Sequence, residues 1–192
     1  MRRSSFLLAL STVTAVVASV LVAPLAAQSA PTVVIIVRHA DKAAAPANDP
    51  PLTEVGVERA RALADFLKDA KVGAVMHTPT TRTRETARVT AERFGITPEV
   101  IPTGPVPVVS AALVEMVRRH RGQTILIVGH SNTVMPWIDA LGGPQRANLC
   151  DHQYDGIYTL ILDDSSVRLV EGRYGPPNPA PTAPCATMPP RP

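Results

Sequence analysis

With 192 residues, 45% of them apolar, the chain has the length of one folded domain with some extra sequence at its ends. Its formal net charge is +3, and without Arg2 and Arg3 the remainder carries 17 basic against 16 acidic residues. Aromatic residues make up only 4% of the sequence. A nearly neutral chain with so few aromatic rings lacks the basic surface and stacking platforms of nucleic-acid-binding proteins, so we expect no nucleic-acid partner.

Residues 1–30 have the pattern of a secretory signal peptide. Met1-Arg2-Arg3 precedes an almost wholly apolar stretch, residues 6–25, and small residues follow. We expect cleavage near residues 27–30 and export to the periplasm or the extracellular space. Because the apolar stretch is long for a signal peptide, an uncleaved membrane anchor is the alternative, and only in that case do we expect contact with a membrane.

The first predicted strand ends in two residues of chemical interest. Residues 33–37 are five consecutive β-branched residues, and Arg38 and His39 follow directly. A continuous apolar run of this kind is typical of a buried parallel strand. Ligands of open α/β sheets bind beyond the carboxyl ends of such strands. An imidazole beside a permanent cation at that position indicates anion chemistry.

Two further apolar runs have the same arrangement. Residues 72–76 precede a segment that contains Arg82, and residues 124–128 lead into Gly129-His130-Ser131. If the three strands are neighbours in one sheet, the two strand-end histidines and both arginines meet in a single crevice.

The remaining periodicity alternates helices with strands and predicts a single three-layer α/β/α domain over residues 31–174. The sheet is expected to be mostly parallel, with a β-hairpin at its edge. Four helices are predicted, over residues 53–67, 79–94, 110–120 and 132–141; Thr53 caps the first, Pro79 opens the second and Ser110 caps the third. Further strands are predicted at 99–101, 154–162 and 166–171.

The C-terminal segment, residues 175–192, contains 8 prolines among 18 residues, which predicts an extended or disordered tail. One cysteine, Cys185, lies in this tail, and the other, Cys150, lies in the domain. In an oxidising compartment they would form a disulfide that holds the tail against the domain, and two free thiols are the alternative. Their spacing does not decide between these, and it does not fit a metal site.

Four short elements, in this order and at this spacing, resemble the histidine phosphatase (phosphoglycerate mutase-like) superfamily. They are Arg38-His39-Ala40, Leu52-Thr53-Glu54-x-Gly56, the Thr-Pro-x-x-Arg-x-x-x-Thr-Ala run from Thr78 to Ala87, and Gly129-His130-Ser131. The resemblance extends from residue 33 to 174, and the chain looks like a short, exported member of bacterial type.

The resemblance implies a role for four residues. His39 would be the nucleophile, because a neutral imidazole nitrogen can attack phosphorus and form a phosphohistidine. Arg38 and Arg82 would bind the phosphoryl oxygens, which guanidinium groups match in geometry and charge. His130 would hydrogen-bond the same phosphate and act with His39 in catalysis. Other arginines of the segment after 78, such as Arg84, are interpreted as surface charges.

The chain departs from the family pattern at the proton donor. Where one branch has an acidic residue directly after the second histidine, this sequence has Ser131. Another branch places a glutamate after the third strand, where this chain is rich in proline. Glu99, Glu115 and Asp41 are the nearest candidates, and the sequence favours a plain surface carboxylate for each.

The sequence therefore predicts an exported phosphatase that hydrolyses phosphomonoesters through a phosphohistidine, with no metal and no cofactor. Its substrate would be a phosphorylated small molecule or an exposed phosphoryl group. A non-catalytic phosphate- or phospholigand-binding protein of the same fold is the alternative, and the missing acid supports it. A third hypothesis is that the four elements occur by chance in an unrelated exported domain.

Overall fold

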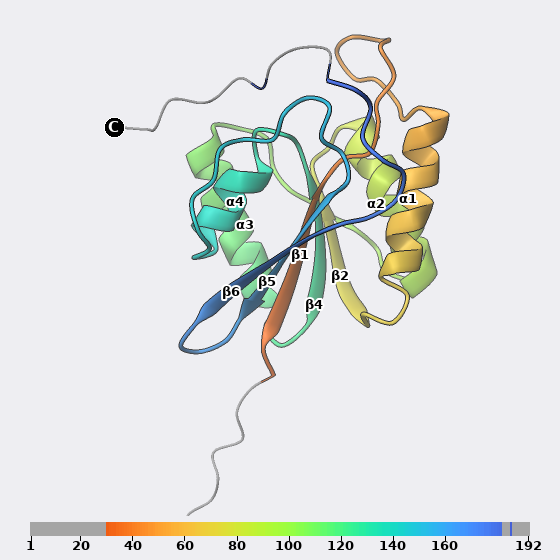
Figure 1. Ribbon diagram of the computed structural model, residues 1–192. Helices are drawn as coiled ribbons and strands as arrows, with labels where there is room; N and C mark the ends of the chain where they lie inside the picture. The colour runs from red at the N-terminus through yellow and green to blue at the C-terminus, as the bar shows by residue number, and fades with distance from the viewer. Residues whose placement is uncertain (1–29, 182–184, 186–192) are drawn as a thin grey trace, which may run out of the picture.

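The computed structural model describes residues 30–181 and Cys185, which form one six-stranded sheet with helices on both faces (Figure 1). The predicted signal segment lies outside the described residues, apart from Ala30. Along the chain the elements are β1 (Thr32–Arg38), α1 (Glu54–Phe66), β2 (Val72–His77), α2 (Thr81–Phe94), β3 (Glu99–Val100), α3 (Val106–Arg119), β4 (Thr124–Gly129), α4 (Val134–Ala140), β5 (Gly156–Leu162) and β6 (Val167–Arg173). Within this part of the chain no helix has the length and apolar character needed to cross a membrane.

The strand order in the sheet is β3-β2-β4-β1-β5-β6. Strands β1 to β4 are parallel, whereas β5 and β6 form an antiparallel hairpin that pairs with β1 at one side. This is the predicted three-layer fold with a mostly parallel sheet and an edge hairpin. Because β1, β2 and β4 are neighbours and parallel, the residues that follow them emerge at the same edge of the sheet.

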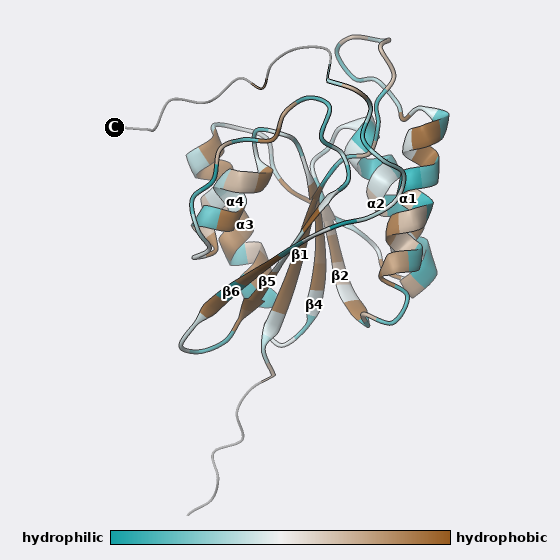
Figure 2. Cartoon of the chain, viewed as in Figure 1, coloured by the Kyte–Doolittle hydropathy of each residue, from teal (hydrophilic) through white to brown (hydrophobic). Residues whose placement is uncertain are grey.

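Alternate side chains of β1 pack into two separate apolar clusters. Val34 and Ile36 join the buried residues of α3 and α4, among them Trp137, on one face of the sheet. Ile35 and Val37 join those of α1 and α2 on the other face. In the hydropathy colouring the strands are mostly hydrophobic, whereas the helices carry both hydrophobic and hydrophilic residues (Figure 2). Because both faces of the sheet are buried, the parallel strands are continuous apolar runs in the sequence.

The predicted start of the third helix was wrong. Ser110 is not its cap, because α3 begins at Val106 and Ser110 lies buried within it, its hydroxyl without a hydrogen-bond partner. The prolines of this segment predict a loop, but Pro107 lies in the first turn of the helix, where proline is tolerated. Smaller differences affect α2, which begins at Thr81 instead of Pro79, and α4, which begins at Val134.

The first helix begins as predicted and fixes the loop that follows His39. The side chain of Thr53 accepts a hydrogen bond from the backbone N–H of Gly56 at 3.1 Å, which caps α1. A Cβ atom at Gly56 would overlap the backbone carbonyl of Asp41. Glycine at this position therefore lets α1 pack directly against the backbone two residues beyond His39.

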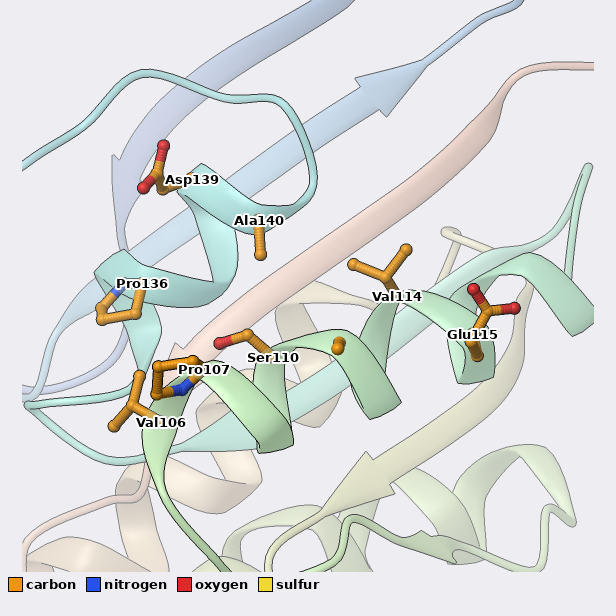
Figure 3. Close-up of a pocket in the computed structure, with 9 residues that line it drawn as sticks. Val106, Pro107, Ser110, Val114, Glu115, Pro136, Asp139 and Ala140 are labelled. Carbon is orange, nitrogen blue, oxygen red and sulfur yellow. The ribbon is translucent and has the colours of Figure 1, made fainter.

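A groove of about 400 Å³ lies between α3 and α4 (Figure 3). Apolar side chains make up most of its lining, together with Ser110, Glu115 and Asp139. Neither of the two strand-end histidines nor Arg38 or Arg82 lines this groove, so it is separate from the predicted site.

Candidate active site

The two strand-end histidines lie side by side. Arg38 is paired in register with Gly129 on the neighbouring strand, and the backbone N–H of His39 donates to the Gly129 carbonyl at 2.9 Å. The residues that follow these positions are therefore adjacent, and the ring centroids of His39 and His130 are 5.4 Å apart. The parallel pairing of β1 and β4 brings the two imidazoles together at the carboxyl edge of the sheet.

One ring nitrogen of His39 is left as a nucleophile. Its Nδ1 lies 2.9 Å from the carbonyl oxygen of Ala40, and because a carbonyl only accepts, Nδ1 carries the proton and Nε2 keeps its lone pair. His39 is 3% exposed. Burial, with smaller contributions from the charges of Arg38, His130 and Arg82, lowers the pKa of His39 to about 2. The ring is therefore neutral over the physiological pH range.

The second histidine is also neutral, and both of its nitrogens have partners. Nδ1 of His130 accepts a long contact of 3.4 Å from Nη2 of Arg82, so Nε2 carries the proton and donates to Oγ1 of Thr78 at 2.8 Å. Burial, followed by the charges of Arg82 and Arg38, lowers the pKa of His130 to about 4. A contact as long as 3.4 Å is weak, so an anion that accepts from Nη2 of Arg82 would readily replace Nδ1 of His130 as its partner.

The first turn of α2 supplies Arg82. Its Nη1 lies 3.6 Å from Oδ1 of Asp49, whose carboxylate also accepts hydrogen bonds from the backbone N–H and hydroxyl of Thr81. The Thr81 hydrogen bonds keep the pKa of Asp49 below its usual range. Arg84 and Arg88 of the same helix are exposed, as the sequence predicts, and bond only to other residues of α2.

Arg38 is 2% exposed and is held mainly by the segment before β5. Its Nη1 donates to the backbone carbonyls of Cys150, Asp151 and Gln153 at 2.9, 2.8 and 3.1 Å. Its guanidinium carbon lies 4.2 Å from the ring centroid of Tyr154, within cation–π range. Nη2 has one long contact, 3.5 Å, to the exposed carboxylate of Asp151. One edge of the guanidinium is thus occupied by the protein, and Nε and Nη2 remain for a ligand.

Two buried cationic donors without partners favour an anion at this site. Among the buried side-chain atoms of the described residues that lack a hydrogen-bond partner are Nε of Arg38 and Nε of Arg82. A buried cationic donor left unpaired costs free energy, and an oxyanion would remove that cost. The two donors belong to the side chains whose charges act on His39. The arrangement can therefore hold a phosphoryl group against a neutral nucleophile.

None of the three acid candidates is free at this edge. Asp41 is not the surface carboxylate that the sequence favoured: it is buried, and its Oδ2 accepts from Nε of the fully buried Arg59 at 2.7 Å. Glu99 and Glu115 form ion pairs with basic residues at the end of α3. In the described residues no carboxylate hydrogen-bonds to His39 or His130, and no three His, Cys, Asp or Glu side chains gather as a metal site.

Sequence reasoning missed several residues that support the site. Thr86 accepts a hydrogen bond at 2.9 Å from the backbone N–H of Ala40, and Thr83 bonds to the hydroxyl of Thr78 at 3.0 Å. The ring of Tyr154 lies 6.0 Å from that of His39. A signal for the threonines does exist in the sequence, because Thr83, Thr86 and Thr90 recur at helical spacing on the buried face of α2.

The comparison with known proteins agrees with this geometry. The model of the histidine phosphatase superfamily (branch 1) matches residues 34–103, the segment that contains Arg38, His39 and Arg82. The protein histidine phosphatase SixA, solved with tungstate, is 25% identical in sequence, with a TM-score of 0.60 over 74% of this chain and 96% of that chain. The chain thus resembles the histidine phosphatase superfamily in sequence over residues 34–103 and in fold over most of its length.

Other solved structures share the fold at lower identity. A phosphoglycerate mutase from Bacillus anthracis is 16% identical, with a TM-score of 0.54 over 76% of this chain and 94% of that one. A mycobacterial glucosyl-3-phosphoglycerate phosphatase is 14% identical, with a TM-score of 0.54 over 76% of this chain and 99% of that one. No curated protein sequence matches the chain significantly. These neighbours are named as a phosphatase and a mutase; their likeness to this chain is one of fold and does not fix its substrate.

Proposed function

We propose that this protein hydrolyses phosphomonoesters through a phosphohistidine at Nε2 of His39 and without a metal ion. The observation that carries the proposal is the neutral Nε2 of a buried histidine beside two guanidinium groups with unpaired Nε donors. Nε2 attacks phosphorus, and the bond to the ester oxygen breaks with its electron pair, so that the alcohol oxygen departs and takes a proton from water. Water then attacks the phosphohistidine, which releases inorganic phosphate and restores the neutral ring.

In this mechanism Arg38 and Arg82 bind the nonbridging oxygens and stabilise the charge that develops on them during in-line transfer. His130 would turn its ring when the phosphoryl group binds, so that its Nε2–H leaves Oγ1 of Thr78 and donates to one of the same oxygens. The lowered pKa of each histidine leaves both of them neutral, so His39 is ready to attack without losing a proton first.

A second candidate substrate is a phosphohistidine on another protein. It is favoured by the fact that no described carboxylate hydrogen-bonds to either site histidine, because a site without an acid suits leaving groups that depart without a donated proton. An imidazole whose far nitrogen takes its proton from water is such a group. The structural neighbour SixA is described as a protein histidine phosphatase.

We also propose that the protein works outside the cytoplasm. The basic and apolar segment within residues 1–30 supports this, and so does the disulfide between Cys150 and Cys185, a bond that persists in oxidising compartments.

The test is the hydrolysis of p-nitrophenyl phosphate by residues 31–192 with EDTA present, over roughly pH 4 to 8. We expect turnover that EDTA does not reduce and that His39→Ala abolishes while the circular dichroism spectrum stays unchanged. Activity retained in a pure His39→Ala preparation would contradict the role of His39. A folded wild-type protein that binds phosphate but turns nothing over would favour the non-catalytic binding protein.

A further inference from the structure

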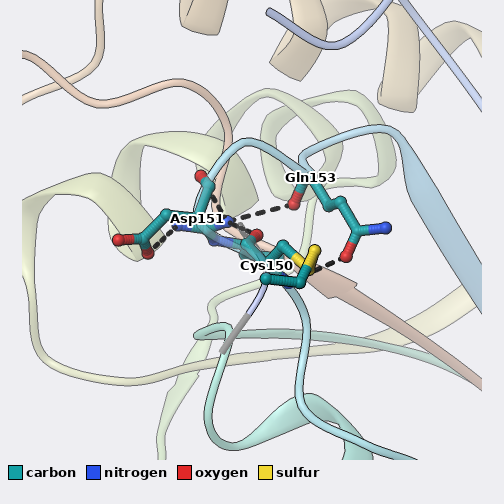
Figure 4. The surroundings of a disulfide bond; sticks show 5 residues. Cys150, Asp151 and Gln153 are labelled. Atoms are coloured by element: carbon teal, nitrogen blue, oxygen red, sulfur yellow. Dashed lines mark hydrogen bonds and ion pairs between the residues drawn. A yellow bond between two sulfur atoms is a disulfide. The ribbon is translucent and has the colours of Figure 1, made fainter. Parts of the chain in front are cut away.

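The segment from Cys150 to Asp155, called the 150–155 loop below, is attached to the C-terminal tail at both of its ends. Cys150 forms a disulfide with Cys185, whose surroundings are shown in Figure 4. At the other end, Oδ1 of Asn178 accepts hydrogen bonds from the backbone N–H groups of Tyr154 and Asp155 at 2.7 and 3.0 Å. Asn178 and Cys185 are named the C-terminal tether here.

The 150–155 loop is the element that holds Arg38. All three carbonyls that accept from Nη1 of Arg38 belong to it, and so does the Tyr154 ring that faces both Arg38 and His39. These contacts decide which edge of the guanidinium faces the site. Nη1 already donates to three backbone carbonyls, whereas Nε has no hydrogen-bond partner. The position of the loop therefore determines how the guanidinium is presented to a phosphoryl group.

The loop has little regular structure of its own to fix it. It lies at the end of a 15-residue connection between α4 and β5 that contains no helix or strand. Within it, the backbone N–H of Gln153 donates to the carbonyl of Cys150, and the side chain of Gln153 accepts from the backbone N–H of Cys150. Long connections of this kind have many accessible conformations unless outside contacts restrict them.

The tail is itself bound to α1 through Arg59. Nη1 of the buried Arg59 donates to the carbonyl of Pro176 at 2.6 Å, and Nε of Arg59 bonds to Asp41 in the loop after His39. The described part of the tail thus joins the two loops that follow β1 and α4. These loops lie at the same end of the sheet (Figure 1).

We propose that the C-terminal tether is a positioning element of the active site, which holds the 150–155 loop so that Arg38 presents Nε and Nη2 to the phosphoryl group. The inference rests on the proposed function of this site in binding phosphoryl groups. Asn178 and the two cysteines touch no substrate and act through Arg38. Without the tether the domain keeps its sheet and both apolar clusters, and it loses affinity for tetrahedral oxyanions.

The experiment compares wild type with the double variant Cys150→Ser, Cys185→Ser, which removes the disulfide without leaving a free thiol. Calorimetric titration with tungstate measures oxyanion affinity, and p-nitrophenyl phosphate hydrolysis measures turnover. We expect the tungstate Kd and the KM to rise about tenfold, the loss expected when one charge-assisted hydrogen bond is weakened, with a smaller change in kcat. Asn178→Ala, which leaves the disulfide intact, should change both constants in the same direction.

A double-mutant cycle separates positioning from general destabilisation. Combined with Arg38→Ala, loss of the disulfide should cost no further tungstate affinity, because its effect acts through that guanidinium. Val72→Ala, in β2 at the opposite end of the sheet, is the control: it lowers the melting temperature and leaves the tungstate Kd unchanged.

Either of two results would overturn the proposal. One is wild-type tungstate affinity in both tether variants. The other is a loss of affinity that adds in full to that of Arg38→Ala. A wild-type protein that neither binds tungstate nor hydrolyses the ester would instead contradict the proposed function of the site, which keeps the two failures distinct.

Discussion

At the scale of single residues, the chemistry depends on which nitrogen of His39 carries the proton. The Ala40 carbonyl settles this, because it accepts a hydrogen bond from Nδ1 and so leaves Nε2 unprotonated, with its lone pair free. The sequence could predict the histidine, its position after a strand and its neutral state. It could not predict the tautomer, because the backbone geometry after β1 decides it.

Arg82→Ala should lower kcat/KM for p-nitrophenyl phosphate by about 100-fold or more, the usual cost of losing a donor that stabilises transition-state charge. Arg84→Ala is the matched control from the same helix, and it should change kcat/KM by less than about twofold, since exposed surface substitutions seldom matter. Steady-state kinetics of both variants test the assignment. Equal losses would show that Arg82 has no special role.

The lowered pKa values of the two site histidines predict a specific titration. Burial disfavours the imidazolium, so we expect His39 to stay neutral down to a pKa of about 2 and His130 down to about 4. The unfolded chain binds these protons near its ordinary histidine pKa of about 6.5, so stability should fall as the pH drops below that value and stay level above it. Proton NMR of the ring resonances, assigned with His39→Gln and His130→Gln, measures the two titrations. A titration midpoint near 6.5 for His39 would refute its lowered pKa.

At the scale of elements, close backbone packing positions the loop after His39. Thr53 caps α1, and Gly56 lets the helix approach the carbonyl of Asp41, whose carboxylate binds Arg59 of the same helix. The sequence shows the cap and the glycine, but it does not show what the glycine touches. Its interpretation of Asp41 as a surface group failed because the partner, Arg59, lies in α1 beyond a loop.

Gly56→Ala tests this packing. Alanine favours a helix by up to about 1 kcal/mol over glycine, whereas overpacking against rigid atoms costs roughly 1–3 kcal/mol, so we expect net destabilisation and weaker phosphatase activity. Gly73→Ala is the matched control, because its added methyl group would meet the movable end of the Gln123 side chain. Thermal unfolding of the two variants distinguishes them. A Gly56→Ala protein as stable as wild type would show that the Asp41 backbone shifts at little cost to make room for the methyl group.

At the scale of the whole molecule, the sequence predicts the layers better than the details of the site. Continuous apolar strands, such as residues 33–37, and the alternating helices reveal a covered parallel sheet. The prolines misplace the start of α3 by several residues and that of α2 by two. The two histidines and two arginines could be found because each follows a strand or opens a helix that follows one. Tyr154 and Asn178 could not be found, and the choice between a Cys150–Cys185 disulfide and two free thiols stayed open, because all of these depend on how the tail returns to the sheet.

The central claim is that the phosphoryl group passes through Nε2 of His39, and rapid-quench labelling tests it most directly. Wild-type protein is mixed with a ³²P-labelled phosphomonoester, stopped in alkali during turnover, digested and mapped. We expect a base-stable, acid-labile label on the peptide that contains His39, and no label in His39→Ala. Turnover without such a label, or a label that persists in His39→Ala, would contradict it.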